Sequence, residues 1–211
     1  MDFDFTAIGA ELRYKLLCSF VGPRPIALVT TLGQDGVPNA APMSFFNVFA
    51  QTPPLLILGL QDRPHGPKDT TRNVRDTGEL VVNLVDAPIA RQMVACSVDH
   101  PPEVDEALVA GFTWAASTAV RPGRIAEAPV AFECVLHEKL ETESRYVFIG
   151  RITWLAARAG LIDTEAWRVN LRDYRPVARF GASFYTRTNE RFSLSDGPGR
   201  QAPTSTGIDE M

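Results

Sequence analysis

The chain has 211 residues, a formal net charge of -4 and 45% hydrophobic residues, values typical of a globular protein with a sizeable core. Its weak negative charge gives no electrostatic reason to expect a nucleic acid or an anionic membrane as a partner. No charged-then-apolar leader and no apolar run of bilayer-spanning length is visible, so we expect a cytoplasmic location.

The first predicted element is a short helix over residues 6–18 that leads to the Gly22–Pro23 break. We expect it to be a lid and not part of the core. A β-branched run, a Gln-Asp-Gly turn signal and a second extended pattern then predict a hairpin from Ile26 to Phe49. Pro42 interrupts the second arm of this hairpin. Because proline cannot donate to a ladder, we expect an edge, a bulge or a ligand-facing kink there.

Two short apolar runs, residues 55–60 and 79–85, predict strands that are buried on both faces. A short, weakly apolar helix is predicted between them. It should begin near Asp69 or Thr70 and end before Gly78, whose lack of a side chain suits a left-handed cap.

The next segment contains two predicted short helices, at residues 88–97 and 103–110. Pro102 and Glu103 form a plausible first turn for the second helix. Residues 113–129 carry no periodic pattern and are expected to be irregular.

Two long strands with partial alternation, residues 130–141 and 146–157, then predict a second hairpin. At least six strands and few helical patterns favour a mainly β fold, an antiparallel barrel with short peripheral helices, over alternating βαβ units. We expect one domain over residues 1–194. The tail at residues 195–211 is rich in Gly, Pro, Ser and Thr and is expected to be disordered.

Residues 68–73 form the first candidate site. The start of a helix presents free backbone N–H groups and a favourable dipole for anions, and here it stands beside a lysine, two hydroxyls and an amide. These groups suit a phosphate. The alternative is that Asp69 or Thr70 simply caps the helix and Lys68 is solvated, and the local residue types alone favour it.

Residues 39–49 form the second candidate site. Ser44 and Asn47 are polar positions in an apolar extended segment that also contains Phe45 and the Pro42 interruption. A planar heteroaromatic ligand needs this mixture of apolar faces and a few donors. The alternative is a core strand whose polar residues face water, and residue types alone favour that alternative as well.

Other constellations are weaker. The three histidines lack the spacing of a zinc site, so we expect no metal: His65, His100 and His137. No G-x-S-x-G elbow is present and no catalytic side chain is nominated, while Asp105 and Glu106 are interpreted as a solvated helix face. The three cysteines form no C-x-x-C pair, and we expect reduced, mostly buried thiols: Cys18, Cys96 and Cys134.

The order of the pieces is itself a pattern. The segments in question are "PRPIALVTTLGQDGVPNAAPMSFFNVFAQTPPLLILGL", "KDTTRNVRDTGELVVNL", "PVAFECVL", "YVFIGRI", "YRPVARFGASFY" and "RFSLS". Over roughly residues 12–195 this order resembles the flavin reductase-like family of FMN-binding split-barrel proteins.

The resemblance implies a homodimeric split β-barrel that holds FMN, or FAD, near the dimer interface. The expected activity is that of an NAD(P)H-dependent flavin (FMN) oxidoreductase, a flavin reductase in which NADH or NADPH passes hydride to flavin N5. Such a reaction needs no side-chain nucleophile. Two alternatives stay open: a flavoredoxin-like electron carrier without NAD(P)H turnover, and a flavin-dependent oxidase of a small organic substrate. A partner monooxygenase or electron-transfer protein is a further possibility.

The resemblance also assigns cofactor-binding residues. For the flavin phosphate it implies Lys68, Thr70 and Asn73, with Asp69 kept as a cap. For the ring and ribityl chain it implies seven residues: Thr30, Thr31, Pro42, Met43, Ser44, Phe45 and Asn47.

Four further residues and one segment are less determined by the resemblance. Arg24 is a candidate for the phosphate or ribityl region. Ala182 stands where relatives often have a second glycine, so the roles of Arg179 and Tyr185 stay open beyond a lining role. The insertion at residues 88–129 is expected to set specificity.

Overall fold

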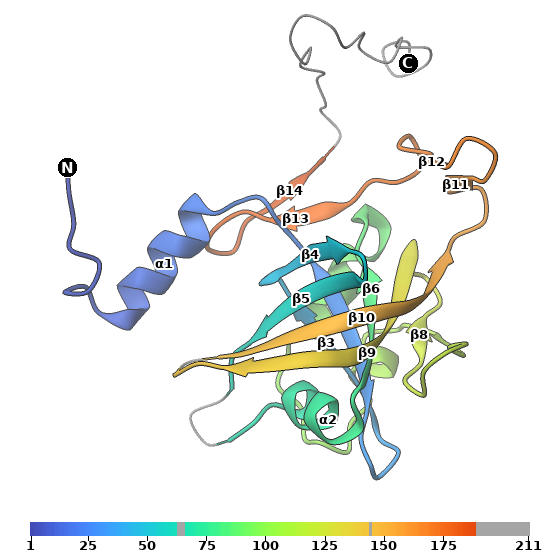
Figure 1. The fold of residues 1–211 in the computed structure, drawn as a ribbon, viewed down its shortest axis with the longest axis horizontal. Helices are drawn as coiled ribbons and strands as arrows, with labels where there is room; N and C mark the ends of the chain where they lie inside the picture. The colour runs from blue at the N-terminus through green and yellow to red at the C-terminus, as the bar shows by residue number, and fades with distance from the viewer. Residues whose placement is uncertain (63–65, 144, 189–211) are drawn as a thin grey trace, which may run out of the picture.

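The computed structural model describes residues 1–62, 66–143 and 145–188 (Figure 1). The predicted tail at residues 195–211 lies outside these residues. Among the helices of the described part, none is long and apolar enough to span a membrane.

A seven-stranded antiparallel sheet forms the centre of the molecule, in the order β3-β2-β6-β9-β10-β5-β4. Its strands are β2 (Ala27–Leu32), β3 (Pro38–Met43), β4 (Phe46–Gln51), β5 (Pro54–Leu60), β6 (Glu79–Leu84), β9 (Val130–Glu141) and β10 (Tyr146–Ala157). The predicted mainly β, antiparallel barrel with short helices is confirmed, and the two long strands have the predicted bounds.

The two ends of this sheet are joined by a very short connection. β3 and β4 are the outermost strands, yet only Ser44 and Phe45 separate them in the sequence. The carbonyl oxygen of Phe45 accepts a hydrogen bond from the N–H of Gly59 on β5 (2.7 Å). The sheet must therefore curl until its edges meet, which gives it the shape of a barrel.

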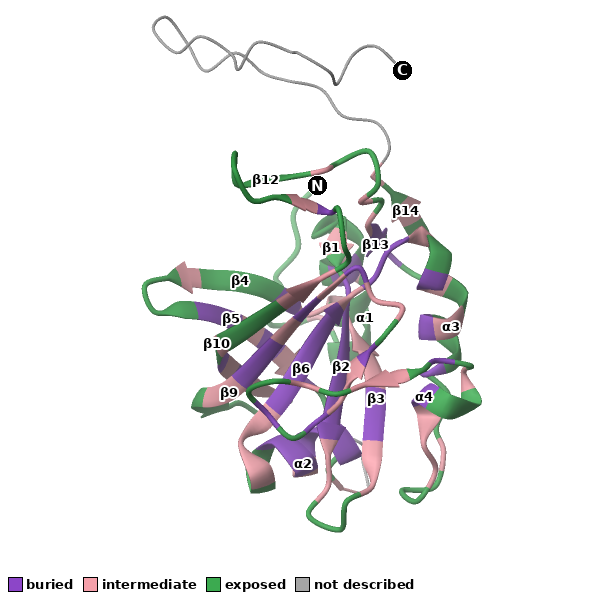
Figure 2. Ribbon diagram, turned by 90° about the vertical axis from the view of Figure 1, so that its right-hand side faces the viewer, coloured by how far each residue is buried: buried purple, intermediate pink, exposed green. Residues whose placement is uncertain are grey.

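The core lies on both faces of this curled sheet (Figure 2). Inside, Leu58, Val82 and Phe148 belong to one buried cluster. Outside, Leu28 and Met93 belong to a second cluster that the segment after β6 covers. The strand at residues 79–84 has a continuous buried centre, as its apolar run predicts.

The helices are short and peripheral: α1 (Ala10–Phe20), α2 (Asp69–Thr77), the 3-10 turn η1 (Ala87–Ile89), α3 (Ala90–Ala95) and α4 (Glu106–Val109). α1 extends away from the barrel in Figure 1, and Cys18 is its one buried residue. It is therefore outside the core, as predicted.

Short strands complete the fold. A three-stranded sheet contains β1 (Arg24–Pro25), β13 (Val177–Arg179) and β14 (Tyr185–Arg187). Two-residue pairs are formed by β7 (Trp114–Ala115) with β8 (Arg124–Ile125), and by β11 (Ile162–Asp163) with β12 (Arg168–Val169). The predicted irregular segment thus contains only one such pair.

The predicted hairpin from Ile26 to Phe49 is wrong in its second half. Its first arm pairs with β3 in the register Leu28↔Pro42, but β4 leaves this pair and lies against β5. The break at Ser44 lets the chain cross to the opposite edge of the sheet. Pro42 lies in an edge strand, as expected of a residue that cannot donate to a ladder.

The start of α2 at Asp69 is confirmed, but its cap and the start of α4 differ from prediction. Lys68 occupies the N-cap of α2, and neither Asp69 nor Thr70 caps this helix with its side chain. α4 begins only after Asp105, because the Asp105 carboxylate accepts the N–H of Leu108 (3.0 Å) and so fixes the cap there. The predicted closure of α2 by Gly78 is confirmed, with φ 69°.

The three cysteines are free and buried, as predicted. Burial raises the pKa of the thiols of Cys96 and Cys134 to about 12. These two thiols are therefore unsuited to nucleophilic or redox chemistry at neutral pH.

Candidate functional site

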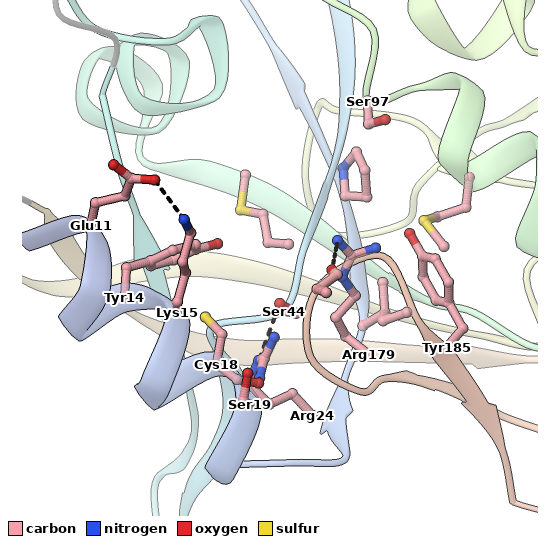
Figure 3. Close-up of a pocket in the computed structure, with 15 residues that line it drawn as sticks. Glu11, Tyr14, Lys15, Cys18, Ser19, Arg24, Ser44, Ser97, Arg179 and Tyr185 are labelled. Atoms are coloured by element: carbon pink, nitrogen blue, oxygen red, sulfur yellow. Dashed lines mark hydrogen bonds and ion pairs between the residues drawn. The ribbon is translucent and has the colours of Figure 1, made fainter.

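A cavity of about 790 Å³ lies between α1, β3, α3 and the β13–β14 hairpin (Figure 3). This volume is within the range of cofactor and substrate sites. The residues that line the cavity are Glu11, Tyr14, Lys15, Cys18, Ser19, Arg24, Ile26, Pro42, Met43, Ser44, Met93, Ser97, Arg179, Ala182 and Tyr185.

Helix α1 forms one wall of this cavity, and aromatic and cationic side chains hold it against the rest of the protein. The ring of Tyr14 stacks on that of Phe45, with centroids 6.2 Å apart, and the guanidinium of Arg145 lies 4.2 Å from the Phe45 centroid. Burial raises the pKa of Tyr14 and lowers the pKa of Arg145. These contacts hold a helix that is otherwise largely exposed.

Arg24 links the end of α1 to the edge strand. Its Nη1 donates to the carbonyl oxygens of Cys18 (2.6 Å) and Val21 (2.8 Å), and its Nε donates to the Ser44 hydroxyl (3.4 Å). The last carbonyls of a helix lack intrahelical partners, and a cation suits them. Arg24 therefore positions both α1 and Ser44 at the cavity.

A smaller cavity of about 130 Å³ adjoins the large one, because Pro42 and Ser97 line both. Its other lining residues are Asn39, Ala41, Lys68, Asp69, Thr70, Cys96, Val98, Asp99 and Glu106. We treat the two neighbouring cavities as one candidate site, with the first as its large half and the second as its small polar half.

The polar half contains the start of α2. The first helical hydrogen bond runs from the N–H of Arg72 to the carbonyl of Lys68 (2.9 Å), so the preceding turn presents its N–H groups outside the ladder. The Thr70 hydroxyl accepts from the Asn39 amide (2.9 Å) and keeps its own proton to donate. The helix start, the Thr70 hydroxyl and Lys68 together suit an oxyanion such as a phosphate. Thr71 lines neither cavity, and its buried hydroxyl has no hydrogen-bond partner among the described residues.

Carboxylates also line the polar half, Asp69 and Glu106 among them. Asp69 forms an ion pair with Arg72 (2.5 Å). Glu106 accepts the backbone N–H of Ala40 (3.2 Å), and burial raises the pKa of its carboxyl. The interpretation of Asp105 and Glu106 as a solvated helix face is therefore wrong, since one caps α4 and the other lines a cavity.

The structure places six of the predicted cofactor residues in the lining of these cavities: Arg24, Pro42, Met43, Ser44, Lys68 and Thr70. Arg179 and Tyr185, whose roles the sequence leaves open, also line the large cavity.

The other five predicted residues do not line either cavity. Thr30 is buried and donates to the carbonyl of Gly123 (2.6 Å). Thr31 and Asn73 are buried partners of each other (3.1 Å) beneath α2. Phe45 stacks behind the α1 wall, and Asn47 is exposed with its side chain turned to the N–H of Val48. Their roles at a cofactor stay predictions.

Sequence reasoning missed most of the α1 and α3 side chains that line the site, among them Tyr14, Lys15 and Met93. No local pattern identifies them, because their place depends on tertiary packing. Asn39 is different: a buried amide in a strand next to prolines was a polar signal of the same kind as Ser44. Among the described residues, no group of three or more His, Cys, Asp or Glu side chains is placed to hold a metal ion, and His65 lies outside these residues.

Comparison with known proteins gives a consistent result. The family model described as "Flavin reductase like domain" matches residues 22–177. The chain is similar to the 2-nitrobenzoate 2-nitroreductase of Pseudomonas fluorescens, with 35% identity and a TM-score of 0.86 over 96% of this chain and 100% of that one. It is also similar to nitrilotriacetate monooxygenase component B of Bacillus cereus, with 29% identity and a TM-score of 0.87 over 92% and 98% of the two chains.

A third solved structure bears on the fold alone. It is a putative flavin reductase with a split barrel domain from Shewanella frigidimarina NCIMB 400, with 20% identity and a TM-score of 0.77 over 92% of this chain and 98% of that one. The expected split barrel is thereby confirmed.

Proposed function

The chain belongs to the flavin reductase-like domain family, and on that premise we propose that it binds FMN and takes hydride from NADH or NADPH. The observation that carries the proposal is the pair of adjoining cavities. The small one has a helix start, a lysine and a hydroxyl at its polar wall, and the large one has a volume suited to a ring system.

In the polar half, Lys68 would pair with the flavin phosphate and Thr70 would donate its hydroxyl proton to a phosphate oxygen. Asn39 supports this role, because its amide already occupies one acceptor position of the Thr70 hydroxyl. The Asp69–Arg72 ion pair compensates the carboxylate in the first turn of α2. Asn73 and Thr31 would act from beneath by fixing α2 to β2.

In the large half, Pro42 and Met43 would offer apolar contact to the ring system. Ser44, held by Arg24, would offer a hydroxyl to a polar edge of the ring. When bound, the flavin supplies the hydride-accepting chemistry, so no protein nucleophile is required. The protein's task is then to orient two ligands and to restrict water.

Reconstitution followed by turnover tests the proposal. Purified protein with added FMN should show a flavin absorbance that stays with the protein during gel filtration. It should then oxidise NADH or NADPH when free FMN or FAD is supplied. Protein that takes up no flavin would overturn the proposal, and flavin uptake without pyridine-nucleotide oxidation would favour an electron carrier. Oxygen consumption with an organic substrate alone would favour an oxidase.

The acceptor of the electrons has two candidates. The similarity to a nitroreductase at 35% identity favours a small acceptor reduced at bound flavin. The similarity to a monooxygenase component B favours release of reduced flavin to a partner oxygenase. Single-turnover reduction followed by gel filtration separates them, because only the second candidate requires the flavin to dissociate when reduced.

We also propose that the chain forms a homodimer and that residues 1–194 act as one domain. Several large apolar side chains are exposed on α1, β4 and β10: Leu12, Leu17, Phe20, Val48, Phe49, Trp154 and Leu155. Contiguous apolar patches are typical of interaction surfaces, and these side chains are the candidates for the dimer contact. Sedimentation equilibrium measures the mass directly, and a monomer at micromolar concentration would contradict the dimer.

A further inference from the structure

Two arginines oppose each other across the β1–β13 pair. Arg24 on β1 is the direct register partner of Arg179 on β13. In an antiparallel pair, residues in direct register point to the same face with Cβ atoms about 5 Å apart, and like charges there are destabilising. Both side chains line the large cavity (Figure 3).

Backbone carbonyls and the Ser44 hydroxyl accept from only part of the donors of these guanidinium groups. Arg24 uses Nη1 and Nε, and Arg179 uses Nη2 to donate to the carbonyl of Ala182 (2.6 Å). Nη2 of Arg24 and both Nε and Nη1 of Arg179 have no acceptor in the part of the chain that the structure describes. Donors of this kind are normally satisfied, and guanidinium groups match oxyanions through paired hydrogen bonds.

The charges around the cavity lead to the same conclusion. Within residues 1–62, 66–143 and 145–188, neither arginine has a carboxylate ion-pair partner. The one carboxylate in the lining, Glu11, is already paired with Lys15 (2.8 Å). Two positive charges therefore remain uncompensated in one cavity of a chain whose net charge is -4.

The surroundings of the pair indicate what accompanies the anion. The guanidinium of Arg179 lies 4.7 Å from the ring centroid of Tyr185, and Met43, Met93 and Ile26 supply apolar lining. A planar ligand with an aromatic body and a charged end would contact both kinds of surface.

We propose that Arg24 and Arg179 together bind the carboxylate of a small aromatic acid that enters the cavity as the second ligand beside the flavin. This inference deepens the proposed function, because it names the class of molecule that the flavin site would act on. The phosphate-binding donors of Lys68 and Thr70 belong to the adjoining small cavity, so the arginine pair is not needed for the flavin phosphate. The diphosphate of a pyridine nucleotide shares the oxyanion chemistry and is the competing occupant.

Calorimetric titration of the FMN-loaded full chain with benzoate tests the proposal, with benzamide as the neutral analogue of the same shape. Benzoate should bind, and benzamide should bind at least about tenfold more weakly. Arg179→Gln should weaken benzoate binding about tenfold or more and leave benzamide binding unchanged. Arg187→Gln, an exposed arginine on the same hairpin, should change neither. The affinity of Arg179→Gln for FMN should equal that of the wild type.

Three results would overturn the proposal. They are equal binding of benzoate and benzamide by the wild type, no binding of benzoate, and benzoate binding that Arg179→Gln does not weaken. Loss of NADH affinity in Arg179→Gln with unchanged benzoate affinity would assign the pair to the nucleotide diphosphate instead. The wild-type comparison needs no variant, so it decides even if Arg179→Gln fails to fold. If the protein takes up no flavin but still prefers benzoate over benzamide, the proposed function fails and the anion site stands.

Discussion

The side-chain amide of Asn39 on β3 donates to the hydroxyl of Thr70 in the first turn of α2 across 2.9 Å. Both residues are buried, so this bond ties the edge of the barrel to the helix start. Because the hydroxyl oxygen already accepts from Asn39, its proton is available to a ligand in the small cavity.

Thr70→Val should therefore weaken FMN binding about tenfold, since it removes one hydrogen bond to a charged group. Thr70→Ser keeps the hydroxyl and should bind FMN as the wild type does. Flavin fluorescence quenching on titration with protein measures both affinities. Equal affinities of the Val and Ser variants would show that this hydroxyl does not contact the phosphate.

Lys68→Ala should weaken FMN binding by about 1.5 to 3 kcal/mol, the worth of a charge-assisted hydrogen bond to phosphate. The loss should be smaller at high salt, because Lys68 lies at an exposed N-cap. Lys139→Ala removes an exposed lysine on β9 and is the matched control. If Lys68→Ala binds FMN normally while Ser44→Ala binds it much more weakly, the phosphate does not contact Lys68. The proposed position of the flavin ring would still stand.

Some elements of this fold can be predicted from the sequence, and others cannot. The long strands β9 and β10 and the helix α2 follow from local apolar patterns and from the Gly78 cap, so their bounds were predictable. The pairing of β4 with β5 was not predictable, because residues 44–49 have an extended pattern whether they pair with β5 or continue the first hairpin. Only the closure of the barrel decides which neighbour β4 takes.

The site shows the same division. Pro42, Ser44 and Lys68 stand out by residue type, and they line the cavities. The Arg24↔Arg179 register joins residues 155 positions apart in sequence, and no local pattern specifies it. Thr30 is the opposite case: the resemblance assigns it to the flavin, but its hydroxyl donates to the carbonyl of Gly123.

Glu106→Gln should change how stability depends on pH. Burial raises the pKa of the Glu106 carboxyl above its ordinary value of 4.5, the Asp69 charge adds to this, and backbone N–H groups and His100 oppose it. The native state therefore keeps this proton to higher pH than the unfolded state. The resulting stabilisation is full below pH 4.5 and is lost as pH rises through the raised value.

Glutamine carries no charge and can still accept the N–H of Ala40 through its amide oxygen. The free energy of unfolding of Glu106→Gln should exceed that of the wild type at pH 8, and the difference should shrink toward pH 4. Urea denaturation at a series of pH values measures this, with the exposed Glu103→Gln as control. A difference that is the same at pH 4 and pH 8 would contradict a raised pKa as its cause.

Glu133→Gln should destabilise the fold and loosen the segment that follows α4. Glu133 is fully buried on β9, and its carboxylate accepts the N–H groups of Thr118 (2.9 Å) and Ala119 (2.6 Å). Arg124 lies 3.6 Å from the same carboxylate. This one side chain therefore attaches an irregular segment to the barrel by charge and by hydrogen bonds.

The NH2 group of glutamine would face backbone N–H groups that now donate to the carboxylate, so one donor would face another. Arg124 would also lose its counter-charge. Removing one partner of a buried ion pair lowers the free energy of unfolding by about 3 kcal/mol. Glu138→Gln, on the exposed part of the same strand, should cost almost nothing. Denaturant unfolding measures the stability, and hydrogen exchange at residues 116–123 measures the loosening. If Glu133→Gln matches Glu138→Gln in both measurements, apolar contacts and not the carboxylate hold this segment to the barrel. The part of the 88–129 insertion expected to set specificity would then be positioned by packing alone.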